Sequence, residues 1–236
     1  FLFTVPVVLV GVRKRVPIVI NYRGGQAQTF LSNNLRWIRP TLQRADLIVV
    51  PSGFLAAVFA DLGVPVRVVE NIVDLERFSA AKRGKPIWHQ RDRSRPHLVV
   101  TRNLEAIYAV DVAIRAFSLI RRIYPDAILS IAGEGEQLGK LRQLSATLGL
   151  LDCVDFLGRM NNDEIAELYQ TADVMLNSSL VDNMPISVLE ALASGVPVVT
   201  TDVGGIPFIV EHDRTALLVP PHDADAMARE TIRLLD

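Results

Sequence analysis

The chain has 236 residues, 50% of them hydrophobic, which is enough for one large hydrophobic core or two modest ones. Its 25 Lys and Arg residues nearly balance its 26 Asp and Glu residues, and this excludes a strongly basic protein that binds nucleic acid. The single cysteine, Cys153, excludes an internal disulfide and favours a reducing compartment.

The start of the chain is apolar but too short to cross a membrane. Residues 1–12 precede the basic run Arg13-Lys14-Arg15, and no stretch of the sequence approaches the roughly 20 apolar residues of a membrane span. The run is explained either by the tail of a longer apolar segment or by a buried helix that ends before a strand. Because the chain starts at Phe1, inside this run, we expect it to be a fragment.

The first 78 residues predict part of a parallel α/β domain. Strands are expected at 17–22, 46–50 and 66–69, and helices at 26–44 and 53–62. Pro40 should divide the first helix into two pieces, and Ser52 should cap the second helix. The alternation of strand and helix indicates a parallel sheet, but so few strands look like half of a domain.

A basic segment separates the two halves of the chain. Residues 82–95 carry six Lys or Arg residues against Asp92 alone, and Pro96 follows them. We interpret residues 79–95 as an exposed interdomain linker. The alternative is a segment that binds phosphate groups or a membrane surface through its charges.

Residues 96–236 predict one complete doubly wound α/β domain. Strands are expected at 97–101, 127–132, 154–157, 174–177, 196–201 and 216–219. Helices that alternate with them are expected at 111–122, 134–148, 161–171, 185–194 and 223–235. This alternation is typical of a parallel sheet covered by helices, in which ligands bind beyond the carboxyl ends of the strands.

The predicted helix 185–194 carries one charge in an apolar sequence. Glu190 is the only charged residue between Met184 and Thr201, and a carboxylate buried without partners is strongly unfavourable. Its side chain should lean towards the N-terminal end of the helix, where unpaired N–H groups favour a phosphate. This favours a nucleotide pocket, and the alternative is a buried Glu satisfied by backbone donors.

Polar residues and glycines follow the predicted strands, as in a binding site at one edge of a sheet. They are Arg102, Gly133-Glu134-Gly135, Gly158-Arg159, Ser178-Ser179, Asp182-Asn183, Asp202 and Gly204-Gly205. Glycines let the backbone approach a ligand closely, and Arg102 would complement a phosphate, whereas each residue alone could be ordinary turn chemistry. The sequence lacks a dinucleotide fingerprint, a P-loop, a nucleophile elbow and the spacing of metal ligands, so we expect no metal site.

These residues resemble retaining glycosyltransferases with the GT-B fold, particularly family 4. Asp182 and Glu190 are separated by seven residues, like the Glu-x7-Glu signature of that family. Further blocks similar to the family, in its order and spacing, are 21–25, 50–55, 71–74, 101–105, 133–135, 154–158, 194–199, 204–206 and 217–221.

The resemblance implies an α/β fold of the GT-B type, with two Rossmann-like parallel-sheet domains of which the N-terminal one is incomplete. Residues 1–78 would be part of the acceptor-side domain and residues 79–95 the basic linker. Residues 96–236 would be the donor domain, which binds the nucleotide sugar, without its final crossing helix.

The resemblance also implies roles for single residues. Glu190 would bind the ribose hydroxyls of a nucleotide sugar, and Arg102 would contact the diphosphate. Asp182 and Arg102 are the two catalytic candidates. Asp182 would hold the sugar hydroxyls and the diphosphate together with the backbone of Asn183, Met184 and Pro185. The other expected contacts are Gly133, Glu134, Arg159 and Met160 on the donor side, with Met160 near the base, and Arg23, Gly24 and Gly25 on the acceptor side.

Three residues depart from the family pattern. Asp182 replaces the first Glu of the signature, Tyr108 lies about where a Lys is usual, and Arg23 replaces a His. The shorter side chain of Asp182 changes its reach, and Tyr108 leaves Arg102 without a cationic partner.

The resemblance implies transfer of a sugar with retention, without metal or other cofactor. The donor would be a UDP-, GDP- or ADP-sugar and the acceptor a glycan or a lipid-linked glycan, in polysaccharide biosynthesis. We expect a cytoplasmic enzyme with peripheral contact at the inner face of the membrane and no nucleic-acid partner. The alternatives are a sugar-nucleotide epimerase or phosphorylase of the same fold, or a non-catalytic fragment that binds a nucleotide sugar.

Overall fold

The computed structural model describes residues 3–83 and 95–236, which form two compact units. The first unit contains residues 1–71 and 181–184, and the second contains residues 72–180 and 185–236. Most of the predicted linker, residues 84–94, lies outside the described residues. Across the described part of the chain, no helix is long and apolar enough to span a membrane.

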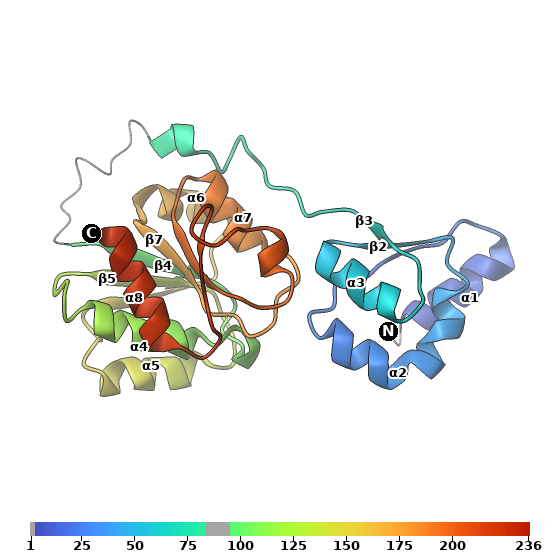
Figure 1. Ribbon diagram of the computed structural model, residues 1–236, viewed down its shortest axis with the longest axis horizontal. Helices are drawn as coiled ribbons and strands as arrows, with labels where there is room; N and C mark the ends of the chain where they lie inside the picture. The colour runs from blue at the N-terminus through green and yellow to red at the C-terminus, as the bar shows by residue number, and fades with distance from the viewer. Residues whose placement is uncertain (1–2, 84–94) are drawn as a thin grey trace. The chain divides into compact units, whose positions relative to one another are not determined.

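The first unit is built on a parallel sheet in the order β1–β2–β3 (Figure 1). Its strands are β1 (Val19–Asn21), β2 (Leu47–Val50) and β3 (Arg67–Val68), and its helices are α1 (Thr4–Lys14), α2 (Ala27–Leu42) and α3 (Gly53–Asp61). The apolar faces of α2 and α3 bury Leu31, Leu55 and Phe59. Ser52 caps α3 as predicted, because its side chain accepts a hydrogen bond from the backbone N–H of Leu55 at 3.3 Å.

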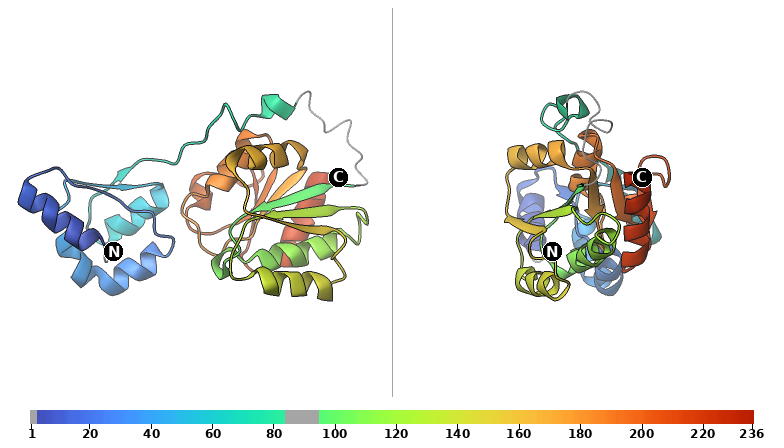
Figure 2. Two further views of the ribbon diagram at one scale, coloured as in Figure 1. Left: turned by 180° about the vertical axis from the view of Figure 1, so that it is seen from behind. Right: turned by 90° about the vertical axis from the view of Figure 1, so that its left-hand side faces the viewer.

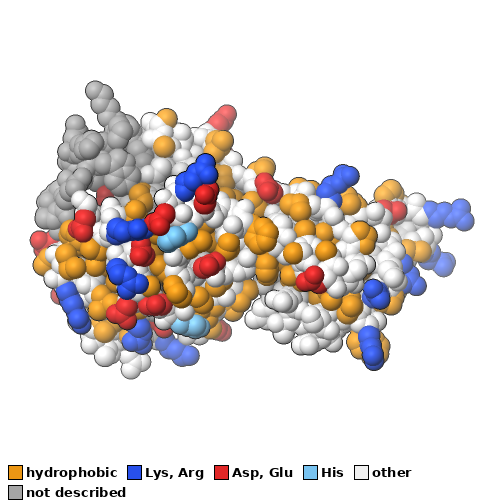
Figure 3. Space-filling view, in the orientation of Figure 1, with side chains coloured by type: hydrophobic (Ala, Val, Ile, Leu, Met, Phe, Trp, Pro, Cys, Tyr) orange, Lys and Arg blue, Asp and Glu red, His pale blue; other side chains and the backbone are white. Residues whose placement is uncertain are grey.

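Two expectations for the first unit need correction. Helix α2 is continuous rather than divided, because Pro40 lies in its last turn and removes only one helical N–H donor. Residues 4–14 form a helix, α1, but it is not buried: among its apolar side chains Val8 is covered, whereas Val7 and Leu9 are mostly exposed. Lys and Arg side chains gather at the end of the unit that carries α1 (Figure 3).

The second unit is a doubly wound α/β domain. Its parallel sheet has the order β6–β5–β4–β7–β8–β9. The strands are β4 (His97–Thr101), β5 (Ile128–Ala132), β6 (Val154–Gly158), β7 (Val174–Asn177), β8 (Val198–Thr201) and β9 (Leu217–Val219). The helices are α4 (Val110–Ile120), α5 (Leu138–Thr147), α6 (Asn162–Thr171), α7 (Ile186–Ala193) and α8 (Ala224–Leu235). Each predicted strand and helix of this domain is present, within a few residues of its expected bounds.

Helices cover both faces of this sheet. Figures 1 and 2 show α4, α5 and α8 on one face and α6 and α7 on the other. Successive residues of β4 point to opposite faces, so Leu98 and Val100 pack with the first group and Val99 with the second. The strand order reverses between β4 and β7, and such a switch point leaves a crevice at the carboxyl ends of the strands.

Residues just before the domain boundary expected at residue 78 pack with the second unit. Residues 72–83 belong to the second unit, where Phe78 is only 2% exposed and its ring packs edge-on against Tyr169, with 6.2 Å between the ring centroids. Arg77 donates to Asp163 at 2.7 Å and pairs with Asp74 at 3.2 Å. This segment is therefore anchored by an aromatic side chain whose partners are distant in the sequence.

Candidate functional site

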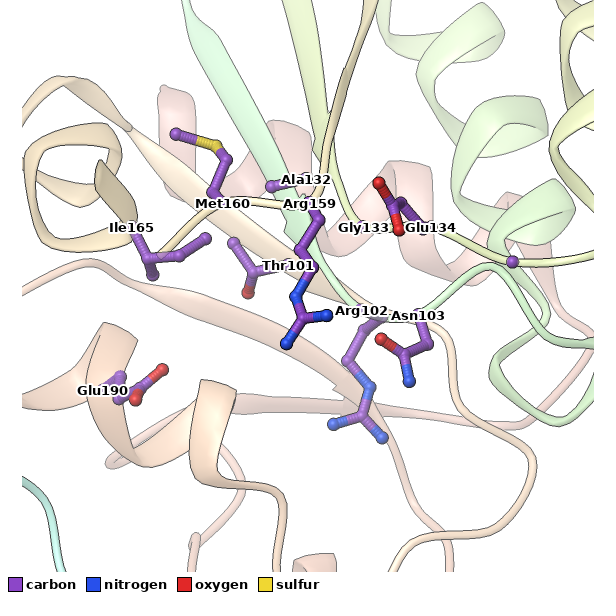
Figure 4. A pocket seen from close by; sticks show the side chains of 11 residues that line it. Thr101, Arg102, Asn103, Ala132, Gly133, Glu134, Arg159, Met160, Ile165 and Glu190 are labelled. Atoms are coloured by element: carbon purple, nitrogen blue, oxygen red, sulfur yellow. The ribbon is translucent and has the colours of Figure 1, made fainter. Parts of the chain in front are cut away.

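A pocket of about 630 Å³ opens at the carboxyl ends of β4, β5 and β6 (Figure 4). Every residue that lines it belongs to the second unit. The lining residues are Thr101, Arg102 and Asn103 after β4, Ala132, Gly133, Glu134 and Gly135 after β5, Arg159 and Met160 after β6, Ile165 from α6 and Glu190 from α7. The pocket therefore brings together six of the predicted site residues: Arg102, Gly133, Glu134, Arg159, Met160 and Glu190.

The glycines of the pocket allow two loops to pack against each other. A Cβ atom on Gly133 would lie 2.0 Å from the carbonyl oxygen of Arg102, and one on Gly135 would lie 2.3 Å from that of Leu104. The N–H of Leu104 donates to the carbonyl of Glu134 at 2.8 Å, which joins the loop after β4 to the loop after β5. The sequence predicted close approach of the backbone to a ligand, but the close neighbour that the structure describes is the backbone of another loop.

Arg102 contacts both an aromatic ring and a hydroxyl on the pocket wall. The carbon of its guanidinium lies 4.1 Å from the centre of the Tyr108 ring, which is a cation–π distance. Its Nη1 atom donates to the hydroxyl of Ser187, in the first turn of α7, at 3.3 Å. Figure 4 shows the guanidinium groups of Arg102 and Arg159 pointing into the space between the strand loops and α7. The pocket thus presents two positive charges from different loops, and these contacts hold the one on Arg102 in place.

Glu190 enters the pocket from the opposite wall, on α7 (Figure 4). It is half-buried, and burial raises the pKa of its carboxyl group from about 4.5 to about 7. Within the described residues, its carboxylate makes no hydrogen bond or ion pair, so the alternative of a Glu satisfied by backbone donors finds no support there. A carboxylate in this state is suited to accept hydrogen bonds from a ligand.

The predicted site residues 182–185 are divided between the two units. Asp182, Asn183 and Met184 belong to that unit, while Pro185 is the N-cap residue of α7 in the second unit. The structure therefore does not describe Asp182 relative to the pocket, and its predicted pairing with Glu190 stays a prediction.

Two predicted groups do meet inside the first unit. The amide nitrogen of Asn183 donates to the carbonyl of Gly24 at 2.8 Å and to that of Arg23 at 3.2 Å. The guanidinium of Arg23 donates to the side chain of Asn71 at 2.8 Å. The side chain of Asn71 also donates to the carbonyl of Met184 at 2.8 Å. Arg23 and Gly24 are thus hydrogen-bonded to residues that are far from them in the sequence.

Sequence reasoning missed four pocket residues and one residue that supports the pocket. The four that line the pocket are Thr101, Asn103, Ala132 and Ile165, and Tyr169 lies under it, fully buried. Tyr169 occupies the same helical face as the buried Ala166, three residues earlier, so a polar residue in the apolar stripe of α6 was a usable signal. In the described residues, no three His, Cys, Asp or Glu side chains gather in a cluster that could hold a metal.

Comparisons with known proteins agree with this architecture. Residues 88–236 match the family described as glycosyl transferases group 1, and residues 2–77 match the family described as Glycosyltransferase Family 4. The crystal structure of Anabaena HepE in complex with UDP and glucose superposes with a TM-score of 0.83 at 21% identity, over 99% of this chain and 66% of that one. The predicted α/β fold of the GT-B type is confirmed.

Two similar sequences are named for sugar-transfer or synthase activities. A GDP-mannose-dependent alpha-(1-6)-phosphatidylinositol monomannoside mannosyltransferase of Mycobacterium tuberculosis is 31% identical over 80% of this chain and 52% of that protein. An N-acetyl-alpha-D-glucosaminyl L-malate synthase of Bacillus anthracis is 30% identical over 94% of this chain and 59% of that protein. The chain thus spans between about half and two thirds of the length of these relatives. Because one family match alone covers more than half of its residues, the chain belongs to the glycosyl transferases group 1 family.

Proposed function

We propose that the pocket binds a nucleotide-sugar donor, and that the whole protein transfers the sugar to a glycan or a lipid-linked glycan with retention of configuration. The observation that carries this proposal is the carboxylate of Glu190, raised in pKa to about 7 and facing a pocket that also holds Arg102 and Arg159. A carboxylate that accepts hydrogen bonds from hydroxyl groups and two cations in the same pocket match a ribose joined to a diphosphate.

Each part of the donor would face pocket residues of matching chemistry. Glu190 would accept hydrogen bonds from the ribose hydroxyls, and Arg102 and Arg159 would hold the diphosphate. Met160 and Ile165 provide the apolar end of the pocket, which suits a planar base. The backbone of Gly133 and Glu134 would border the donor from the loop after β5.

The names of similar proteins support a nucleotide-sugar donor without selecting its base. One solved neighbour binds UDP-glucose, and the mycobacterial relative is named as dependent on GDP-mannose. Binding measurements with UDP, GDP and ADP distinguish uracil, guanine and adenine as the base of the donor.

The proposed chemistry needs positive charge more than a strong base. The diphosphate must leave the sugar, and preorganised cations at that position stabilise the charge that develops. Arg102 would serve this role, with Asp182 and the backbone of Asn183 to Pro185 holding the sugar. We propose that this occurs without a metal or other cofactor, in polysaccharide biosynthesis at the cytoplasmic face of the membrane.

Calorimetry of this chain with UDP, GDP and ADP tests the nucleotide site. We expect at least one of them to bind, and Glu190→Gln should weaken that binding by about 1–3 kcal/mol because a charged hydrogen bond is lost. Glu167→Gln, on the exposed face of α6, is the matched control and should leave the affinity unchanged. Absence of binding to all three nucleotides would remove the basis of the proposal.

The reaction itself needs the whole protein. Incubation with the nucleotide sugar that binds best, followed by NMR of the anomeric proton of the product, should show the same configuration as in the donor. An inverted product would contradict retention. Conversion of the donor without any acceptor would indicate an epimerase instead.

A further inference from the structure

Tyr108 and Arg102 form a contact that the proposed donor site does not explain by itself. The ring of Tyr108 lies under the guanidinium of Arg102, with 4.1 Å between the guanidinium carbon and the ring centre. Because the ring is neutral, this contact fixes the plane of the guanidinium without cancelling its charge and without using one of its N–H donors. A carboxylate at the same place would do both.

Tyr108 is itself held in place by the backbone around it. It ends the short 3-10 helix η3 (Ala106–Tyr108), and its carbonyl accepts a hydrogen bond from the hydroxyl of Ser178 at 3.0 Å. The N–H of Leu180 donates to the carbonyl of Ile107 at 2.8 Å. Two hydrogen bonds therefore tie η3 to the segment that follows β7. The side chain of Tyr108 is half-buried against the core on the α4 side of the sheet.

The guanidinium is also fixed at its end, by α7. Ser187 accepts a hydrogen bond from Nη1 of Arg102 at 3.3 Å, and its own carbonyl accepts one from the hydroxyl of Tyr169 at 3.0 Å. Arg102 is therefore held on one face by a ring and at one end by a hydroxyl, while it lines the pocket.

We propose that Tyr108 is a positioning residue, whose ring orients the guanidinium of Arg102 towards the diphosphate of the bound donor. This inference rests on the proposed function, because it assumes that the pocket binds a nucleoside diphosphate. The ring keeps the guanidinium in one orientation before the ligand arrives, so that little side-chain entropy is lost on binding.

A second cation lines the pocket of this chain, which has Tyr108 where the family pattern has a Lys. The second cation of the pocket is Arg159, which reaches it from the loop after β6 rather than from the loop after β4 (Figure 4). Tyr108 thus strengthens the placement of one cation, and Arg159 supplies the other.

Two variants separate the ring from the hydroxyl of Tyr108. Tyr108→Leu removes the aromatic face and keeps a smaller apolar side chain, whereas Tyr108→Phe keeps the ring. The dissociation constant of the best-binding nucleoside diphosphate should rise about 3- to 30-fold in Tyr108→Leu and should stay within about twofold of wild type in Tyr108→Phe. Far-UV circular dichroism and thermal unfolding establish that both variants are folded.

A double-mutant cycle with Arg102→Ala gives a result that a merely structural role would not produce. If the ring acts through the guanidinium, Tyr108→Leu should have little further effect on nucleotide affinity once Arg102 is Ala. Additive losses, or equal affinity in wild type and Tyr108→Leu, would overturn the inference. If the wild-type chain binds none of UDP, GDP and ADP, the proposed function fails, and this inference fails with it.

Discussion

The hydroxyl of Tyr169 lies 2.6 Å from the hydroxyl of Thr101 and donates to the carbonyl of Ser187 at 3.0 Å. A tyrosine has one hydroxyl proton, so Thr101 is the donor in the first of these bonds. Tyr169 is fully buried, and burial raises the pKa of its hydroxyl well above its usual value. This one side chain therefore joins the end of β4 to the first turn of α7 underneath the pocket.

Tyr169→Phe should destabilise the second unit by about 1–3 kcal/mol, because two buried polar groups lose their partner. The measurement is urea denaturation followed by circular dichroism. Tyr124→Phe is the control: its hydroxyl donates to Asp236 at an exposed position, and its loss should change stability by less than about 0.5 kcal/mol. Equal effects of the two substitutions would contradict the role of Tyr169.

Gly133→Ala should destabilise the domain by about 1–3 kcal/mol or more, because its Cβ atom meets the carbonyl oxygen of Arg102 and one of the two loops must move. Nucleotide affinity should fall as well, because the loop after β4, which Gly133 contacts, carries Arg102. In Gly139→Ala, in α5, the added Cβ atom meets no atom within 4 Å, so this substitution should stabilise the helix by about 0.5–1 kcal/mol. The two unfolding midpoints should therefore move in opposite directions; movement in the same direction would argue against the close packing of the loops.

Glu190→Gln should stabilise the ligand-free protein, and by an amount that depends on pH. The pKa of Glu190 is raised from about 4.5 to about 7 by burial, so the unfolded chain loses this proton at lower pH than the folded chain does. Stability contributed by the protonated carboxyl is present below pH 4.5 and is lost as the pH rises through about 7. Gln does not titrate, so the advantage of the variant should grow over this window and then stay constant.

Urea midpoints of wild type and Glu190→Gln at intervals between pH 4.5 and 8 check this prediction, with Glu167→Gln measured in parallel. A difference between wild type and Glu190→Gln that does not change with pH would show that the carboxyl group is not raised in pKa. Together with the expected loss of nucleotide affinity, the result would mark Glu190 as a residue whose charge costs stability and serves binding.

Phe78→Ala should destabilise the second unit by about 3–5 kcal/mol, because it removes a ring that is buried against Tyr169. Leu75→Ala, in the same segment but 68% exposed, should have little effect. Hydrogen exchange of peptides from β4 and β7 reports the stability of this unit alone. Unchanged exchange in Phe78→Ala would contradict a stabilising role of Phe78 in the second unit.

The repeating pattern of the sequence determined the second unit almost completely. Apolar runs such as 97–101 and 174–177 are buried strands at their predicted bounds, because a strand covered on both faces needs a continuous apolar run. Glu190 was found by the same logic, as one charge in an apolar helix that had to face a polar space. The expectation that α2 would break at Pro40 was wrong, because the energetic cost of a proline depends on its position in the helix and Pro40 lies in the last turn.

Tertiary structure alone decided which residues meet around these elements. No local pattern indicates that Tyr108 supports Arg102, that Gly133 makes room for the carbonyl of Arg102, or that Phe78 packs against Tyr169. Periodicity reports which side of an element is buried, and it does so from neighbours a few residues away. The partner on the other side is chosen by how whole elements pack, which is a property of the folded chain.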